Sequence, residues 1–252
     1  MLVFNMQLLL KYIIIIGLFS LCDSCSKNDE LPAQNTLELL ASYKINVLEP
    51  SGLAVNSNGT ILYTVSDNSN KIYKLSTTGN VLQTFNYVGN DLEGVSTFTT
   101  NKLLVVEERT KEVVAYDMGT GAFNKHSINY ENTDANSGLE GITYNANDNT
   151  IFILNEKDPG LLIRLRSDFT IVSKVELRFA NDYSGIFYET ATNDLWIVSD
   201  QNKTINKCNL QGQLVKSYPI NVVKAEGIAV FDDKIYVVSD AEAKLYIFKK
   251  PI

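Results

Sequence analysis

One short pattern recurs five times along the chain: a Glu or Ser, then a Gly, then an aliphatic residue. The glycines of the five copies are 42, 47, 44 and 42 residues apart. A fixed period near this length indicates a repeat architecture in which each repeat is one supersecondary unit. Between copies, short runs of apolar and β-branched residues alternate with turn residues, and four such strands per repeat predict the blades of a β-propeller. The glycines are Gly52, Gly94, Gly141, Gly185 and Gly227.

The number of strand-like runs predicts how the ring closes. The first four repeats offer four runs each, whereas the fifth offers three, the last of them at 244–248. A further run at 36–47 precedes the first repeat. We expect this N-terminal strand to complete the fifth blade, because closure removes the open sheet edges that would template aggregation. The predicted fold is therefore all-β, a five-bladed propeller over residues 36–252, with a six-bladed ring as the alternative.

Residues 1–35 have a different composition from the repeats. The apolar run 12–21 follows Lys11 and is shorter than the roughly 20 residues that a membrane-spanning helix needs. The sequence Cys-Asp-Ser-Cys that follows resembles the lipobox of bacterial lipoproteins, with Cys25 as the acylated residue and Cys22 as the alternative acceptor. We therefore expect a signal peptide with lipobox over 1–25 and a polar tether over 26–35.

This N-terminal pattern also predicts where in the cell the protein is located. The polar, acidic residues after Cys25 are similar to the start of many Bacteroidetes lipoproteins. Several acyl chains on one cysteine would give stable membrane anchoring. The expected location is the cell envelope, as an outer-membrane lipoprotein, with display on the cell surface as a further option. The competing interpretation is an ordinary secretory signal with incidental cysteines.

Composition excludes several function classes. The net charge of −7 and the pI near 4.9 argue against a nucleic-acid partner, which needs a basic face. Cys208 is the one cysteine of the repeat region, so we expect neither disulfides nor a cysteine-based metal site there. His126, the one histidine, falls on a predicted outer strand, which disfavours a histidine triad or a histidine–metal site. The sequence offers few residues of the types that commonly act in catalysis, and whether the chain is an enzyme stays open.

The residue before each repeated glycine is the strongest candidate for chemistry. These residues should meet at one mouth of the central channel, because each one starts an inner strand. Two unit charges about 4 Å apart repel by roughly 4 kcal/mol at an effective dielectric constant of 20, so converging carboxylates need protons, water or a cation. Calcium, a hard cation that prefers oxygen ligands, would suit them. The alternative is that each glutamate accepts neighbouring backbone N–H groups and that the channel holds only water. The candidate metal ligands are Glu93, Glu140 and Glu226, and the candidate channel-mouth ligands are Ser51 and Ser184.

A second set of acidic residues ends the second strand of every repeat. An acidic residue at the start of a turn can accept backbone N–H bonds two residues on. We therefore interpret this set as structural first and as site residues second. The five are Asp67, Glu108, Glu156, Asp200 and Asp240.

These motifs resemble known families. The repeated Glu-Gly starts, the five repeats and the N-terminal cysteine resemble the SdiA-regulated family of bacterial propellers over about 36–252, a family without an established reaction. The acidic turns resemble NHL repeats. A looser similarity is to the calcium-dependent gluconolactonase and paraoxonase propellers, which have six blades. That similarity implies an axial calcium on Glu93, Glu140 and Glu226, although those enzymes carry Asn and Asp where this chain has Ser51 and Ser184.

The sequence as a whole favours a binding or sensing module with a cation or small-ligand site at the channel. One alternative is a calcium-dependent hydrolase of the lactonase or esterase type. Another is a scaffold for envelope proteins. The expected partners are the membrane, through a lipid anchor, and a small molecule or protein on the axial face, but not nucleic acid.

Overall fold

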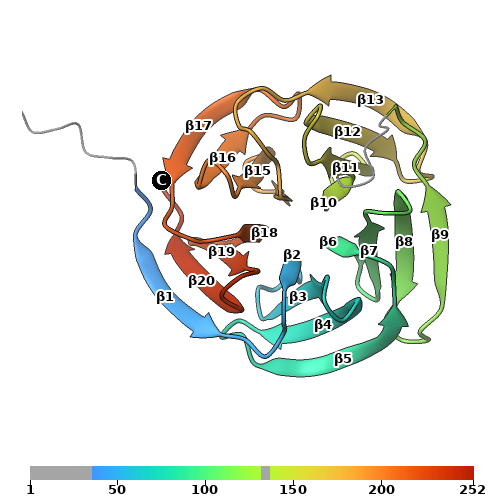
Figure 1. The fold of residues 1–252 in the computed structure, drawn as a ribbon, viewed down its shortest axis with the longest axis horizontal. Helices are drawn as coiled ribbons and strands as arrows, with labels where there is room; N and C mark the ends of the chain where they lie inside the picture. The colour runs from blue at the N-terminus through green and yellow to red at the C-terminus, as the bar shows by residue number, and fades with distance from the viewer. Residues whose placement is uncertain (1–35, 132–136) are drawn as a thin grey trace, which may run out of the picture. The chain divides into compact units, whose positions relative to one another are not determined.

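The computed structural model describes residues 36–131 and 137–252, and Figure 1 shows their arrangement. These residues form twenty strands and no helix, and the strands make five antiparallel sheets of four strands each around a central axis. The five-bladed propeller is thereby confirmed, and the six-bladed alternative is wrong. The predicted signal peptide, lipobox and tether lie outside the described residues.

In the first four blades, chain order runs from the innermost strand to the outermost. The first blade is β2 (Pro50–Val55), β3 (Ile61–Ser66), β4 (Lys71–Ser76) and β5 (Val81–Val88); the second is β6 (Leu92–Thr99), β7 (Lys102–Glu107), β8 (Glu112–Asp117) and β9 (Phe123–Ser127); the third is β10 (Leu139–Asn145), β11 (Thr150–Asn155), β12 (Leu161–Arg166) and β13 (Ile171–Glu176); the fourth is β14 (Gly185–Glu189), β15 (Asp194–Ser199), β16 (Thr204–Cys208) and β17 (Leu214–Pro219).

The fifth blade joins the two ends of the described chain. Its inner strands are β18 (Ala225–Phe231), β19 (Lys234–Ser239) and β20 (Lys244–Lys249), and β1 (Leu39–Lys44) pairs antiparallel with β20 on the outside. The predicted closure by the N-terminal strand is confirmed. Ile45, which directly follows β1, is buried in the core between the fifth and first blades.

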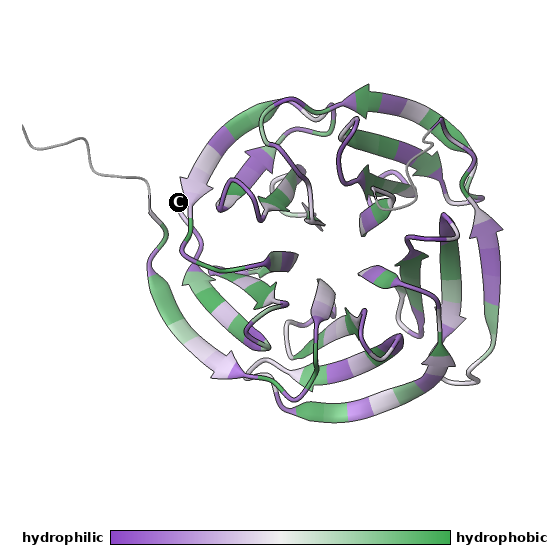
Figure 2. Cartoon of the chain, viewed as in Figure 1, coloured by the Kyte–Doolittle hydropathy of each residue, from purple (hydrophilic) through white to green (hydrophobic). Residues whose placement is uncertain are grey.

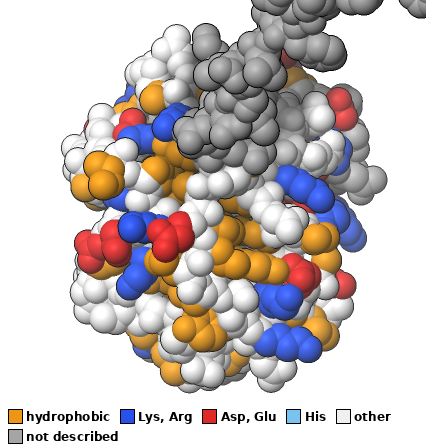
Figure 3. Space-filling model, turned by 90° about the vertical axis from the view of Figure 1, so that its left-hand side faces the viewer, with side chains coloured by type: hydrophobic (Ala, Val, Ile, Leu, Met, Phe, Trp, Pro, Cys, Tyr) orange, Lys and Arg blue, Asp and Glu red, His pale blue; other side chains and the backbone are white. Residues whose placement is uncertain are grey.

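Burial decreases from the axis outward. Figure 2 shows that hydrophobic and hydrophilic residues are mixed along the strands of the blades. Every residue of β2 is buried, whereas most of β5 is exposed. The cores lie between neighbouring blades: one of them joins Tyr63 and Val65 of the first blade to Leu103 and Val105 of the second. Exposed apolar side chains remain on the outer strands, and Figure 3 shows such side chains scattered among charged and polar ones. Among the described residues, no helix has the length and apolar character needed to cross a membrane.

The repeated glycines make the narrowest part of the ring. Each inner strand contacts the next one around the axis. A Cβ added to Gly94 would stand 2.4 Å from the carbonyl oxygen of Glu140, and one added to Gly185 would stand 2.6 Å from that of Glu226. Only a residue without a side chain permits so close an approach of two backbones. Two cavities without a common lining residue lie at the starts and at the ends of the inner strands, on either side of these glycines.

Candidate functional site

The chamber at the strand starts is an acidic cavity of about 320 Å³. The starts of the inner strands and the turns after the second strands build its wall. It carries eight carboxylates and two lysines. The structure thus brings together all the candidate metal and channel-mouth ligands and four of the five acidic turn residues; Glu108 alone is not in the wall. The lining residues are Ser51, Asp67, Glu93, Glu140, Glu156, Lys157, Asp182, Ser184, Asp200, Gln201, Lys224, Glu226 and Asp240.

β-Bulges place the three candidate glutamates. In the pairing of each inner strand with its neighbour, the register shifts at Glu93, at Glu140 and at Glu226. A bulge leaves a residue unpaired and re-aims its side chain, which is why bulges are frequent beside functional sites. Here they turn carboxylates toward the cavity in the second, third and fifth blades. β14 of the fourth blade pairs without a shift, and Ser184 directly precedes it.

Burial among like charges makes these glutamates hard to ionise. The pKa values of Glu93 and Glu140 are raised well above the usual range, first by desolvation and then by neighbouring carboxylates. Desolvation also raises the pKa of Glu226 to about 7, although Lys224 opposes the rise. Their protonated forms are therefore favoured when nothing else compensates the charge.

Hydrogen bonds from two serines favour the ionised forms of two of the three glutamates. A hydrogen bond from Ser51 lowers the pKa of Glu93, and Ser184 acts on Glu226 in the same sense. Asp182 Oδ2 lies 3.1 Å from the same Ser184 hydroxyl and competes with Glu226 for its one proton. Glu140 has no such help: its side chain is only 9% exposed and accepts no hydrogen bond from any described residue. Lys157 attracts Glu140 electrostatically but forms its ion pair with Glu156, so Glu140 is the least compensated of the three glutamates.

The acidic turn residues do not play the role that we expected. None of the five accepts a backbone N–H from its own turn among the described residues. At three turns the side chain one position earlier does so, as where Ser66 accepts from Ser69 N at 3.0 Å; Ser199 and Ser239 do the same. Because those hydroxyls satisfy the turns, the carboxylates are left to face the cavity.

Several of these turn acids stand beside the candidate glutamates. Carboxylate oxygens of Asp67, Asp91 and Glu93 lie within 4.8 Å of one another, and so do those of Glu108, Glu140 and Glu156. The pKa of Asp67 is raised to about 6, by desolvation first and by Asp91 next. Desolvation likewise raises the pKa of Glu108 to about 6, against a hydrogen bond from the Gly138 backbone.

Sequence reasoning missed Asp91 and Asp182. Asp182 is buried, and its carboxylate accepts from Ser199 and from the backbone N–H of Asp200 and Gln201, both at 3.1 Å. Both aspartates stand three residues before a repeated glycine, where the first repeat has Glu49. An acidic residue three positions before the repeated glycine therefore recurs in three repeats, and this recurrence could have identified both aspartates from the sequence.

The donor set of this cavity suits a hard divalent cation. Its ligand atoms are carboxylate and hydroxyl oxygens, the type that Ca²⁺ and Mg²⁺ prefer. Two carboxylates of the cavity lack hydrogen bonds within the described residues: Glu140 accepts none, and the Oδ1 atom of Asp240 is buried without one. A cation would compensate both. The single histidine takes no part, since His126 on β9 stacks on Phe169 with ring centroids 3.8 Å apart.

Fold and cavity together define a five-bladed β-propeller with an acidic mouth. The chain belongs to the SdiA-regulated family, whose model matches residues 36–179 and 168–251. The described domain lies almost entirely within that match.

Similar solved structures are also propellers. The virginiamycin B lyase of Staphylococcus aureus is 19% identical with a TM-score of 0.51, over 80% of this chain and 66% of the lyase, so the chain spans only about two thirds of that protein. The glutaminyl cyclase of Myxococcus xanthus is 12% identical with a TM-score of 0.67, over 85% of this chain and 96% of that one. A chain of a nidogen/laminin complex is 12% identical with a TM-score of 0.57, over 75% and 72% of the two chains. At these identities the similarity concerns the fold alone.

Proposed function

We propose that this protein is a binding or sensing module that takes a divalent cation, calcium in the first instance, at the acidic cavity. The cation in turn would offer open coordination positions to a small ligand or to a loop of a partner. The observation that supports this most directly is Glu140, a carboxylate 91% buried with no hydrogen-bond donor among the described residues. Ionising a carboxyl group in such surroundings is costly, and a bound cation would offset that cost through the oxygen ligands that it prefers.

Different residues of the chain would bind the cation and orient the residues that bind it. Glu140 and Glu93 supply carboxylates from adjacent blades, and Glu226 approaches from the fifth blade. Ser51 and Ser184 hold two of these glutamates by hydrogen bonds.

Thermal unfolding tests the proposal. We expect calcium at 100 times its dissociation constant to add about 2.7 kcal/mol of stability, which raises the melting midpoint of a domain of this size by roughly 5–10 °C. Magnesium at equal ionic strength should raise it less, because Mg²⁺ demands tighter octahedral geometry. Isothermal titration with calcium would measure the affinity directly.

Glu140→Gln is the decisive variant, because it keeps the shape and removes the charge. It should melt higher than the wild type in chelator, since it removes a carboxyl group that burial makes costly to ionise, and it should lose most of the shift with calcium. Glu176→Gln is the matched control, because Glu176 lies on the outer strand β13 with its side chain 47% exposed. A wild type without a calcium shift, or a Glu140→Gln protein with the full shift, would refute the proposal.

We also propose that the module is anchored to the cell envelope by acylation of Cys25. The support is the lipobox-like sequence before residue 26. Metabolic labelling with an alkyne fatty acid should mark the full chain and leave Cys25→Ser unlabelled. Retained label in Cys25→Ser and its loss in Cys22→Ser would move the acceptor to Cys22.

A further inference from the structure

The ends of the inner strands enclose a second, larger chamber on the other side of the glycine ring. Its volume is about 740 Å³, within the range of roughly 300–1,000 Å³ that is usual for small-molecule pockets. All five blades contribute to it, and it shares no lining residue with the acidic cavity. We call it the aromatic pocket, because half-buried rings from four inner strands line it: Phe98, Tyr144, Phe187 and Phe231.

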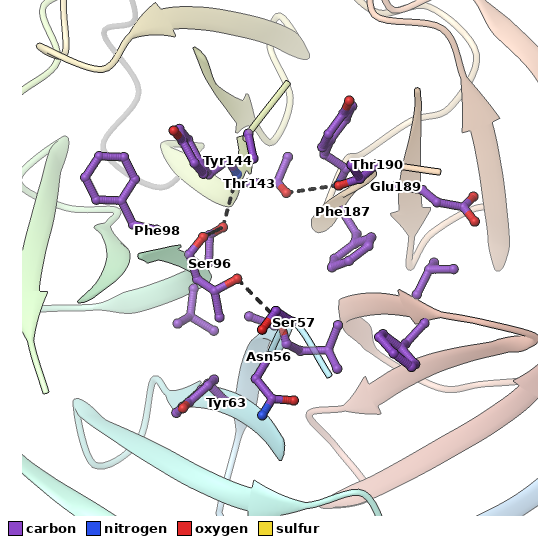
Figure 4. Close-up of a pocket in the computed structure, with 18 of the residues that line it drawn as sticks. Asn56, Ser57, Tyr63, Ser96, Phe98, Thr143, Tyr144, Phe187, Glu189 and Thr190 are labelled. Atoms are coloured by element: carbon purple, nitrogen blue, oxygen red, sulfur yellow. Dashed lines mark hydrogen bonds between the residues drawn. The ribbon is translucent and has the colours of Figure 1, made fainter. Parts of the chain in front are cut away.

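The rings present apolar faces from different sides. Figure 4 shows Phe187 projecting from β14 toward the central opening, with Phe98 and Tyr144 on the other side of it. Phe98 and Tyr144 meet edge to face, with ring centroids 4.8 Å apart at 79°. All four rings are half-buried and contribute to the lining of the pocket. An aromatic ring that packs against such rings gains attraction beyond the apolar area that it buries.

Hydroxyl groups in the wall are fixed by the neighbouring blade. Ser96 Oγ accepts from Tyr144 N at 3.1 Å, and Thr143 Oγ1 accepts from Tyr188 N at 2.9 Å (Figure 4). These bonds tie the second blade to the third and the third to the fourth. A wall that is already ordered loses little entropy when a ligand binds.

The charges around the pocket select against anions. Among the described residues that line it, none is Lys or Arg. Of its carboxylates, Glu189 is 6% exposed and is neutralised by Lys250, with further bonds from Trp196 Nε1 at 2.8 Å and Thr192 Oγ1 at 3.0 Å. An anionic ligand would give up its hydration without gaining a cation as partner.

We propose that the aromatic pocket binds an uncharged small molecule built on an aromatic or similarly flat apolar ring, with hydrogen-bonding groups on its edge. The ring stacks against Phe187 and the Phe98–Tyr144 pair. The polar edge meets the side chains of Asn56, Ser57 and Thr97 at the rim. The site is distinct from the proposed cation site, because the two cavities share no lining residue.

A matched set of probes tests this proposal by ligand-observed NMR on the full chain, measured with calcium and again in chelator. N-benzylacetamide is the neutral ring probe, benzoate its anionic counterpart and N-butylacetamide its ringless counterpart. We expect N-benzylacetamide to bind at least tenfold more tightly than either of the others. Equal binding of benzoate would overturn the charge argument, and equal binding of N-butylacetamide would overturn the ring argument. Binding that chelator abolishes would assign the ligand to the acidic cavity instead.

Variants locate the probe. Phe187→Ala should weaken N-benzylacetamide at least tenfold, whereas Phe123→Ala, a 49% exposed ring on the outer strand β9, should leave it unchanged. If Phe187→Ala melts well below the wild type, its binding result is not interpretable, and Phe98→Ala is used as the test variant instead. Ser57→Lys adds a cation at the exposed rim and should bring benzoate to within threefold of the amide. Unchanged amide binding in both ring variants, or no gain of benzoate in Ser57→Lys, would overturn the assignment.

Discussion

Gly227 lies against Gly52 so closely that a Cβ on Gly227 would stand 2.4 Å from the carbonyl carbon of Gly52. This contact joins the fifth blade to the first and completes the ring of glycines. In turn, a Cβ on Gly52 would stand 2.7 Å from the Cα of Gly94. The same residues that mark the repeat in the sequence therefore set the radius of the channel between its two chambers.

Gly227→Ala should destabilise the protein, because the new methyl group meets backbone that cannot rotate away. We expect a loss of about 3 kcal/mol, at the upper end of what overpacking usually costs. Chemical denaturation followed by circular dichroism would measure it. Gly119→Ala is the control: its Cβ would come no closer than 3.4 Å to Asp117 Oδ1, and it should change the free energy of unfolding little. Equal stability of the two variants would contradict a tight axial ring.

The acidic cavity predicts an unusual pH dependence for the metal-free protein. Glu226 has its pKa raised from 4.5 to about 7 in the folded state, so the folded protein binds the proton more tightly than the unfolded chain does. Its effect on stability is therefore favourable at low pH and is lost as the pH rises from about 4.5 to about 7. At 1.36 kcal/mol per pKa unit, the loss is about 3 kcal/mol.

Glu226→Gln isolates that contribution. In chelator, the variant and the wild type should unfold with similar free energies near pH 4, and the variant should be the more stable by about 3 kcal/mol at pH 8. Denaturant titrations across this pH range would show the divergence. Parallel profiles would mean that Glu226 titrates like an exposed carboxyl group. With calcium present, the wild type should regain stability above pH 7, because metal replaces the lost protons.

Closure of the ring predicts the effect of removing β1. Deleting residues 37–45 should expose the edge of β20 and remove Ile45 from the core between the fifth and first blades. We expect a broad, non-cooperative thermal transition and association of the exposed edges. A chain that starts at residue 35 is the control, since it keeps β1, and it should melt like the full chain. A sharp transition in the 37–45 deletion would show that four complete blades and three strands suffice.

The sequence predicted the fold well because its signal is periodic. Gly94 and Gly227 occupy equivalent positions in the repeat, and backbone contact at the axis demands glycine at each of them. The convergence of Glu93, Glu140 and Glu226 in one cavity followed from that symmetry.

What the sequence did not reveal depends on side-chain geometry within a single turn or strand. An acidic residue beside a serine leaves open which of them caps the turn, and in the first blade Ser66 rather than Asp67 does so. The aromatic pocket was missed because its rings fall at different offsets from the repeated glycine: Phe187 lies two residues after it and Phe98 four. Only the twist of each inner strand decides which of its last residues faces the axis.

The last prediction concerns the charge pair that supports the aromatic pocket. Burial alone would raise the pKa of Glu189, but the bonds from Lys250, Trp196 and Thr192 outweigh it and lower the pKa. Lys250→Met keeps the bulk and removes the charge, which leaves a nearly buried carboxylate without its cation. We expect a loss of about 3 kcal/mol at pH 7, measured by denaturant titration.

The pH dependence and a neighbouring lysine provide the controls for that variant. A lowered pKa stabilises the folded state above the unfolded pKa of about 4.3 and ceases to do so as the pH falls through the folded value, so the wild type and Lys250→Met should converge at low pH. Lys249→Met removes a pair with Glu38 at 3.5 Å, in which both side chains are more than half exposed. Such surface pairs contribute between 0 and about 1 kcal/mol. Because the two lysines are adjacent in sequence and differ mainly in the burial of their partners, equal losses in the two variants would show that Glu189 is not held by Lys250.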